Sequence, residues 1–152
     1  MNNNSSLGSS PLNENRYESV EKYMVPLSKM ITFKPEQPIQ DVIKIIVDKK
    51  ISGAPVLNDQ GGLVGLISEK DCLRIIVDQA YNNLPAETRK VSDYMTAKVQ
   101  SLSPKTNVVE AAKEFLNSPF RRFTIVENGK LIGQVSRRDI LTAAQNMKST
   151  GR

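Results

Sequence analysis

Histidine and tryptophan are both absent from this chain, which contains a single cysteine, Cys72. Without histidine, the chain lacks the side chain that most often serves as general base, proton shuttle or metal ligand. Cys72 therefore has no imidazole partner for nucleophilic catalysis, and we interpret it as a small buried helix residue. A glycine-rich phosphate loop of the Gly-x-x-x-x-Gly-Lys type is also missing. These absences argue against an enzyme and against a metal site.

Long hydrophobic runs are missing as well. No apolar stretch approaches the roughly 20 residues that a membrane helix needs, and the N-terminus lacks the basic and apolar regions of a secretory signal. One cysteine cannot form an internal disulfide, which is typical of a reducing compartment. Residues 1–16 are rich in Asn and Ser, and are expected to be a disordered tail because they cannot offset their ordering entropy. We expect a cytoplasmic protein that does not contact membranes.

Basic residues outnumber acidic ones, 21 to 16, which gives a formal net charge of +5. The basic residues are spread thinly, and their short clusters are Arg89-Lys90, Arg121-Arg122 and Arg137-Arg138. Aromatic residues make up only 5% of the chain, so an aromatic platform for single-stranded nucleic acid is not expected. Nucleic-acid binding therefore rests on charge alone. The positive charge indicates either an ordinary solvated surface or arginine pairs that neutralise a small phosphate beside a helix start.

What the chain does contain is one pattern written twice. A Val-x-x-Tyr-Met box at 20–24 returns at 91–95, and a Gly-x-x-Ser-x-x-Asp stretch at 65–71 returns at 133–139. Between them, five apolar positions of helical spacing also recur: Ile39, Val42, Ile43, Ile46 and Val47 in one copy, and Val108, Ala111, Ala112, Phe115 and Leu116 in the other. Two similar units in one short chain predict a pseudo-symmetric pair, and we expect the functional site at the interface between the two units.

Each copy predicts the order β-α-β-β-α. Pro38 is expected at the first position of one amphipathic helix, and Thr106 is expected to cap its counterpart. Asn128 opens a strong hairpin turn signal, and the second helices start at Ser68 and Ser136. The predicted strands are 29–33, 54–57 and 63–67 in the first copy and 98–102, 123–126 and 131–135 in the second.

The second helices of the two copies differ in their apolar surface. In the first copy, the stretch from Cys72 to Val77 is apolar almost all round, so burial on more than one side is expected. This surplus of apolar surface predicts a homodimer, since a two-fold contact is the default for soluble homo-oligomers. In the second copy, a single apolar face is expected, made by Ile140, Leu141, Ala144 and Met147.

The element order, the hydrophobic-Ser-Gly-Ala-Pro-Val entry at 51–56 and the repeated Gly-x-x-Ser-x-x-Asp junction together resemble the cystathionine β-synthase (CBS) domain. Two in tandem resemble a Bateman module, and the resemblance covers about 20–147. It implies a mixed α/β fold of the α+β type, with two β-α-β-β-α repeats packed as a pseudo-two-fold pair. The expected boundaries are repeat 1 at 17–81, a linker at 82–90, repeat 2 at 91–148 and a tail at 149–152.

The repeated Ser-x-x-Asp junction has two interpretations. It is a capping-box arrangement, in which the serine hydroxyl and the aspartate carboxylate satisfy backbone amides at a helix start. The same geometry also suits a ligand, because free amides favour an anion and a carboxylate accepts both hydrogens of a ribose diol. The resemblance implies that this aspartate holds the ribose of an adenosine ligand, with the adenine against the strands of the other repeat.

Carried onto this sequence, the resemblance gives two candidate sites. The first joins Gln134, Ser136, Arg138 and Asp139 with Ile31, Thr32, Ser52, Gly53 and Pro55. The second joins Leu66, Ser68, Lys70 and Asp71 with Val99, Gln100, Arg121, Arg122 and Thr124. The first site is expected to be better, because Glu69 repels phosphate at the second and Arg122 and Thr124 crowd its base pocket. Gly53 is expected where the adenine or its backbone partners approach closely, because a Cβ would fill that space.

Three functions remain open. The leading one is a stand-alone regulatory module that binds an adenosine-containing ligand (AMP, ADP, ATP, S-adenosylmethionine or NAD) and signals to a separate effector protein. The second is a structural module that dimerises through its helices without a nucleotide. The third, nucleic-acid binding, rests on charge alone.

Overall fold

The computed structural model describes residues 17–150, so the predicted tail at 1–16 and the last two residues lie outside the described part. The described chain divides into two compact units. Unit 1 contains residues 17–29, 101–127 and 132–150, and unit 2 contains residues 30–100 and 128–131. The units therefore do not follow the order of the sequence repeats. Each Val-x-x-Tyr-Met box belongs to the unit that holds the body of the other repeat.

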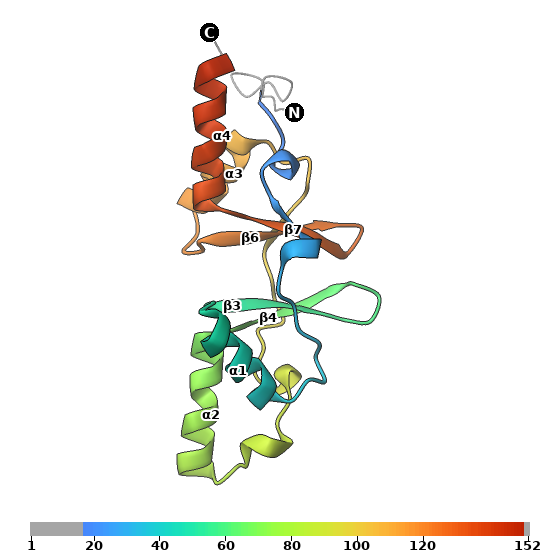
Figure 1. Ribbon diagram of the computed structural model, residues 1–152, viewed down its shortest axis with the longest axis vertical. Coiled ribbons are helices and arrows are strands. Elements are labelled where there is room, and N and C mark those ends of the chain that lie inside the picture. The colour runs from blue at the N-terminus through green and yellow to red at the C-terminus, as the bar shows by residue number, and fades with distance from the viewer. Residues whose placement is uncertain (1–16, 151–152) are drawn as a thin grey trace, which may run out of the picture. The chain divides into compact units, whose positions relative to one another are not determined.

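Unit 1 is built on a four-stranded sheet in the order β2-β7-β6-β5. Its strands are β2 (Val25–Pro26), β5 (Ser101–Leu102), β6 (Arg122–Glu127) and β7 (Lys130–Ser136). β2 pairs antiparallel with β7, and β5 pairs parallel with β6. The helices α3 (Val108–Leu116) and α4 (Arg137–Thr150) lie on the same side of this sheet (Figure 1). The predicted turn between β6 and β7 is present, with Asn128 and Gly129 both at positive φ, 53° and 80°.

Unit 2 has the same order of elements, but fewer of its residues form paired strands. Its sheet has two antiparallel strands, β3 (Gly53–Leu57) and β4 (Leu63–Ser68), and its helices are α1 (Ile39–Lys49) and α2 (Glu69–Asn82). Two single bridges stand where unit 1 has strands: Phe33 pairs parallel with Val56, and Thr96 pairs antiparallel with Leu66. Short 3₁₀ turns occur at Val20–Lys22, Leu27–Lys29, Ala86–Thr88 and Val91–Asp93. The α+β fold predicted from the sequence is confirmed.

Several local predictions need correction. The predicted strand at 29–33 pairs only at Phe33: Lys29 ends a 3₁₀ turn, and residues 30–32 form no strand. Pro38 is the N-cap of α1 rather than its first helical residue. Asn107, not Thr106, caps α3: its side chain accepts from the Glu110 amide at 2.8 Å, and the Glu110 carboxylate accepts from the Asn107 amide at 3.0 Å.

The boxes supply core residues to their units. Val91 and Tyr94 pack with Phe33, Ile39 and other buried residues of unit 2. Val20 packs with the core of unit 1, where Phe115 and Phe123 also meet at 4.6 Å between ring centroids. Each box is therefore part of the hydrophobic core that closes its unit.

Each box tyrosine is also held by its hydroxyl. Tyr94 donates to Asp78 of α2 at 2.7 Å. This bond lowers the pKa of the Asp78 carboxyl, and burial together with the same bond raises the pKa of Tyr94. Tyr23 donates to Glu18 and accepts from Asn146 of α4 at 3.2 Å. These bonds tie each box to the second helix of its unit.

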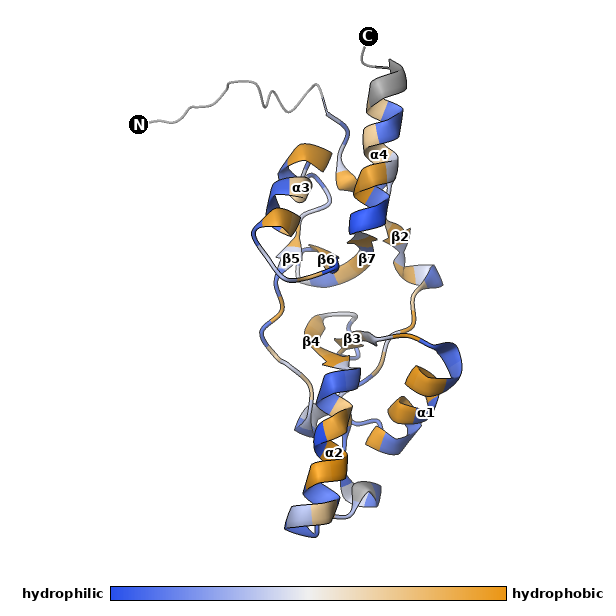
Figure 2. Cartoon of the chain, turned by 90° about the vertical axis from the view of Figure 1, so that its left-hand side faces the viewer, coloured by the Kyte–Doolittle hydropathy of each residue, from blue (hydrophilic) through white to orange (hydrophobic). Residues whose placement is uncertain are grey.

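The predicted burial of α2 on more than one side is wrong. Only Asp71 and Ile75 of this helix are buried, whereas Leu73, Ile76 and Val77 are 59%, 62% and 51% exposed. Apolar colour runs along α2 in Figure 2. Helix α4 also differs from its prediction, because Ala143 is buried in place of the exposed Leu141 and Ala144. The apolar surplus of α2 is therefore surface in the single chain.

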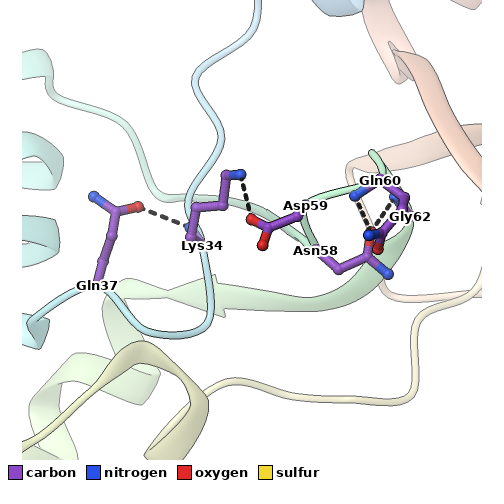
Figure 3. A network of polar contacts seen from close by, with 6 residues as sticks. All are labelled: Lys34, Gln37, Asn58, Asp59, Gln60 and Gly62. Atoms are coloured by element: carbon purple, nitrogen blue, oxygen red, sulfur yellow. Dashed lines mark hydrogen bonds and ion pairs between the residues drawn. The ribbon is translucent and has the colours of Figure 1, made fainter.

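The loop between β3 and β4 is fixed by one asparagine (Figure 3). Asn58 Oδ1 accepts from the amides of Gln60 and Gly62, at 3.0 and 2.8 Å. Asp59 of the same loop forms an ion pair at 2.9 Å with Lys34, which lies on the segment before α1 (Figure 3). This longer turn takes the place of the tight Asn-Gly turn of the second copy, which explains the change of spacing between the repeats.

Candidate functional site

Both strand-to-helix junctions form complete capping boxes. At α2, the Asp71 amide donates to Ser68 Oγ at 3.1 Å, and the Ser68 amide donates to Asp71 Oδ2 at 2.9 Å. At α4, the Asp139 amide donates to Ser136 Oγ at 3.1 Å, and the Ser136 amide donates to Asp139 Oδ2 at 2.8 Å. The capping interpretation of the Ser-x-x-Asp motif is thus confirmed in both copies. It accounts for one carboxylate oxygen of each aspartate and leaves the other to be considered.

The second oxygens of the two aspartates have different surroundings. At Asp71, Oδ1 accepts from the Arg74 guanidinium at 3.2 Å, and the residue is only 5% exposed. At Asp139, which is half-buried, the second oxygen has no hydrogen-bond partner among the residues that the structure describes. Asp139 is therefore the carboxylate with more acceptor capacity left for a ligand.

Four exposed arginines surround the start of α4. The Arg137 amide donates to the Arg121 carbonyl at 3.1 Å, which brings the pair 121–122 next to the pair 137–138. Arg137 is further fixed by its Nε, which donates to the Phe120 carbonyl at 3.1 Å. With Asp139 included, this group has a formal charge of +3. Four arginines at one helix start make this part of unit 1 strongly cationic, which suits phosphate.

The equivalent positions around α2 carry no such charge. The Glu69 amide donates to the Ser52 carbonyl at 2.8 Å, the same contact as at Arg137 and Arg121. The ionic side chains here are Lys70 and Arg74 against Glu69 and Asp71, so their formal charges cancel. The two junctions therefore share their backbone geometry and differ in electrostatics.

The predicted site residues are distributed over both units. Unit 1 holds Arg121, Arg122, Thr124, Gln134, Ser136, Arg138 and Asp139. Unit 2 holds Ile31, Thr32, Ser52, Gly53, Pro55, Leu66, Ser68, Lys70, Asp71, Val99 and Gln100. Each candidate site draws on residues of both units, and its assembly across them stays a prediction. Within unit 2, the strand register sets Gly53 opposite Ser68 and Pro55 opposite Leu66.

Some of these residues have structural roles of their own. Thr124 is 5% exposed and its hydroxyl hydrogen-bonds to that of Ser101. A Cβ added at Gly53 would lie 2.6 Å from the carbonyl oxygen of Ile67, so close strand packing already explains the glycine. The close backbone approach expected at Gly53 is therefore present, with β4 as the approaching strand, and a place for Gly53 beside a base stays a prediction.

The glycines of the repeated motif have a similar explanation. A Cβ at Gly65 would meet Met95 Sδ at 2.7 Å, and one at Gly133 would meet Met24 Sδ at 2.6 Å. Each motif glycine therefore accommodates the methionine of the box that completes its unit. The sequence showed both motifs but gave no signal for this pairing.

The surroundings of Cys72 do not activate its thiol. Burial raises the pKa of the Cys72 thiol, and the neighbouring Asp71 and Glu69 raise it further, which keeps the thiol protonated. Within the described residues, no group of three or more His, Cys, Asp or Glu side chains is placed to hold a metal ion. No helix in that part of the chain has the length and apolar character needed to cross a membrane.

The two units share one small α+β arrangement, and each has a Ser-x-x-Asp capping box at the start of its second helix. The protein is therefore made of a duplicated domain. The family model for the CBS domain matches residues 20–78 and 91–146. The chain belongs to the CBS domain family, and its two domains form a tandem pair, or Bateman module.

Relatives of known sequence support this assignment. CBS domain-containing protein CBSX2, chloroplastic, of Arabidopsis thaliana is 30% identical over 172 residues, which cover 97% of this chain and 71% of that protein. The uncharacterized protein MJ1225 of Methanocaldococcus jannaschii is 30% identical over 112 residues, covering 74% of this chain. That match spans only 38% of the length of MJ1225.

The fold also matches solved structures. The crystal structure of CBSX2 in complex with AMP superposes with a TM-score of 0.75 at 31% identity, covering 86% of this chain and 98% of that one. This likeness shows a CBS pair at the level of the whole fold.

Proposed function

We propose that the protein is a regulatory CBS pair that binds an adenosine-containing ligand at the start of α4. The observation that carries the proposal is the open carboxylate oxygen of Asp139, which lies at a helix start beside four exposed arginines. A carboxylate with a free oxygen accepts the hydrogens of a ribose diol, and arginines bind phosphate oxygens through paired N–H donors. Sugar and phosphate recognition thus meet at one junction.

A related protein supports the choice of ligand. CBSX2, which is 31% identical in its crystal structure, was crystallised in complex with AMP. We infer that the ribose is held by Asp139 and the phosphate by Arg138 and by one or both of Arg121 and Arg122. The sequence assigned these two arginines to the second site, but the contact between Arg137 and Arg121 brings them to the start of α4. The residues predicted from unit 2 to contact the base are Ile31, Thr32, Ser52, Gly53 and Pro55.

A thermal-shift panel of AMP, ADP, ATP, S-adenosylmethionine and NAD tests this proposal. A ligand that binds only the folded state raises the melting temperature, with a stabilisation of about 2.7 kcal/mol at a hundredfold excess over its Kd. We expect at least one ligand to do so, and the Asp139→Asn variant to lose most of the shift. No shift with any of the five would contradict the proposal.

A structural module without a nucleotide is the second candidate. It is favoured by the capping boxes, which give Ser68, Asp71, Ser136 and Asp139 a role without a ligand. It is also favoured by the exposed apolar residues of α2, which we propose form the contact of a homodimer. The same panel separates the candidates, since this module would dimerise yet show no response to nucleotides.

Regulation requires that ligand occupancy changes something that a partner can detect. A ligand shifts a conformational equilibrium only by its difference in affinity for two states, so we propose that occupancy alters the arrangement presented to an effector protein. We further propose that the protein has no catalytic activity of its own and acts in the cytoplasm. Fractionation that places it in another compartment would contradict the last point.

A further inference from the structure

Both oxygens of the Asp71 carboxylate accept hydrogen bonds, from the N-cap serine and from an arginine of α2. Its Oδ2 accepts from both the amide and the hydroxyl of Ser68, each at 2.9 Å, and its Oδ1 accepts from Arg74 Nη1 at 3.2 Å. The Asp71 side chain is 7% exposed, whereas the Arg74 side chain is 61% exposed. The guanidinium therefore pairs with this carboxylate from the solvent side.

Within residues 17–150, Asp139 has no such partner. Arg74 lies three residues after Asp71, and the residue three positions after Asp139 is Thr142. The Thr142 hydroxyl donates to the Arg138 carbonyl at 3.1 Å, so it is used along its own helix. As a result, only one oxygen of Asp139 is occupied, by the Ser136 amide.

We propose that Arg74 closes the first junction to ligands, so that each chain has a single adenosine site, at Asp139. This inference rests on the proposed function of Asp139 as the ribose acceptor. A ribose diol needs a carboxylate with accessible acceptor positions, and at Asp71 it would have to compete with the charge-assisted hydrogen bond that Arg74 makes from the solvent side. Arg74 thus decides whether the Asp71 carboxylate accepts a ribose diol.

Chemical labelling of carboxylates tests the closure without any ligand. The protein is treated with a water-soluble carbodiimide and glycine ethyl ester, and modified residues are located by mass spectrometry. In the parent protein we expect modification at Asp139 and protection at Asp71. In Arg74→Thr, which copies Thr142, modification of Asp71 should rise to the level of Asp139 in the parent. Equal modification of both aspartates in the parent, or continued protection of Asp71 in the variant, would overturn the closure.

Calorimetric titration with adenosine tests its consequence for binding, because adenosine has no phosphate for Glu69 to repel at the first junction. The parent should bind one adenosine per chain, and Arg74→Thr should bind a second that disappears again in Arg74→Thr/Asp71→Asn. The reciprocal variant Thr142→Arg should weaken the single site of the parent by at least about tenfold, or 1.4 kcal/mol. Two adenosine molecules per chain in the parent, or no second one in Arg74→Thr, would overturn the inference. If neither adenosine nor AMP binds either protein, the proposed function fails, and the labelling still decides the role of Arg74.

Discussion

The first turns of α2 and α4 have the same capping box, but the side chains around the two boxes differ in charge. Both helices begin with a serine whose hydroxyl accepts from the aspartate amide at 3.1 Å, and both aspartates return a bond to the serine amide. Around α2, acidic and basic side chains balance and Arg74 covers the carboxylate. Around α4, four arginines gather and the carboxylate keeps one open oxygen. The cap serves the helix in either setting, and the neighbouring side chains decide whether it also serves a ligand.

A duplicated domain can divide its tasks in this way. The capping box contributes to helix stability in both units, so neither copy can lose it without cost. Residues that do not take part in the cap, such as Arg74 and Thr142 or Glu69 and Arg137, are free to differ. Their differences give the two units separate electrostatics on the same scaffold.

The largest expected effect is on strand packing in unit 2. In Gly53→Val, the new Cβ would lie 2.6 Å from the Ile67 carbonyl and 3.0 Å from the Ser68 Cα, and neither backbone atom can rotate away. We expect the free energy of unfolding to fall by about 2–3 kcal/mol, the upper part of the range for overpacking. Urea denaturation followed by circular dichroism measures this.

Ser52→Val is the matched control for this substitution. Ser52 is exposed and precedes Gly53, so the same side chain there should change the free energy of unfolding by no more than about 0.5 kcal/mol. A Gly53→Val protein that keeps its stability but loses AMP affinity would return Gly53 to the base pocket and contradict its packing role.

Removing the charge of one aspartate at a time tests whether Asp139 and Asp71 differ in ligand binding. In Asp139→Asn, affinity for the best ligand of the panel should fall by about 1.5–3 kcal/mol, the range for hydrogen bonds to a charged group. Stability should fall by only about 0.5–1 kcal/mol, because the amide retains part of the cap. Calorimetric titration and thermal melting give the two values separately.

Asp71→Asn is the internal control for Asp139→Asn. Its carboxylate is already occupied by Ser68 and Arg74, so ligand affinity should stay unchanged while the melting temperature falls. Equal losses of affinity in both variants would show that the two junctions bind alike.

Much of the fold was predictable because each element could be predicted twice, once from each copy of the repeat. The hairpin strands, the second helices and both Ser-x-x-Asp caps follow from periodicity and turn chemistry. The cap positions at Pro38 and Asn107 were each missed by one residue, as is usual where several residues near a helix start are able to cap it.

Other features could not be read from the sequence, because they depend on which segments meet. Each Val-x-x-Tyr-Met box packs in the unit formed by the other repeat, and this exchange is seen only in tertiary contacts such as that of Met24 with Gly133. The exposure of Leu73 and Ile76 is of the same kind, since apolar residues on two faces of a helix are equally consistent with burial and with a second partner. Arg74 escaped notice because a single charged residue on a helix usually only solvates its surface.

The exposed apolar residues of α2 also distinguish this helix from α4. Ile76 is 62% exposed and its counterpart in α4, counted from Asp71 and Asp139, is the exposed Ala144. If α2 forms the dimer contact, Ile76→Glu should raise the dimer dissociation constant by at least about tenfold, or 1.4 kcal/mol, because it places an unpaired charge in an apolar interface. Light scattering over a dilution series measures the mass.

Ala144→Glu is the control, with the same charge on the other second helix and no expected change in mass. A parent protein that scatters as 16.9 kDa at tens of micromolar would rule out the homodimer itself. Dissociation by both variants to the same degree would move the contact from α2 to both helices.

The smallest expected effect concerns the arginines at α4. Arg122 is exposed, and Gly53 stands at its equivalent position in the first copy. In Arg122→Gln, affinity for AMP should fall by about 0.2–1 kcal/mol, the range for an exposed ion pair, and the remaining affinity should depend less on salt. Binding of adenosine, which has no phosphate, should not change. Titrations of AMP and adenosine at low and at physiological ionic strength separate a phosphate contact from a general effect of positive charge, because an equal loss for both ligands would place Arg122 away from the phosphate.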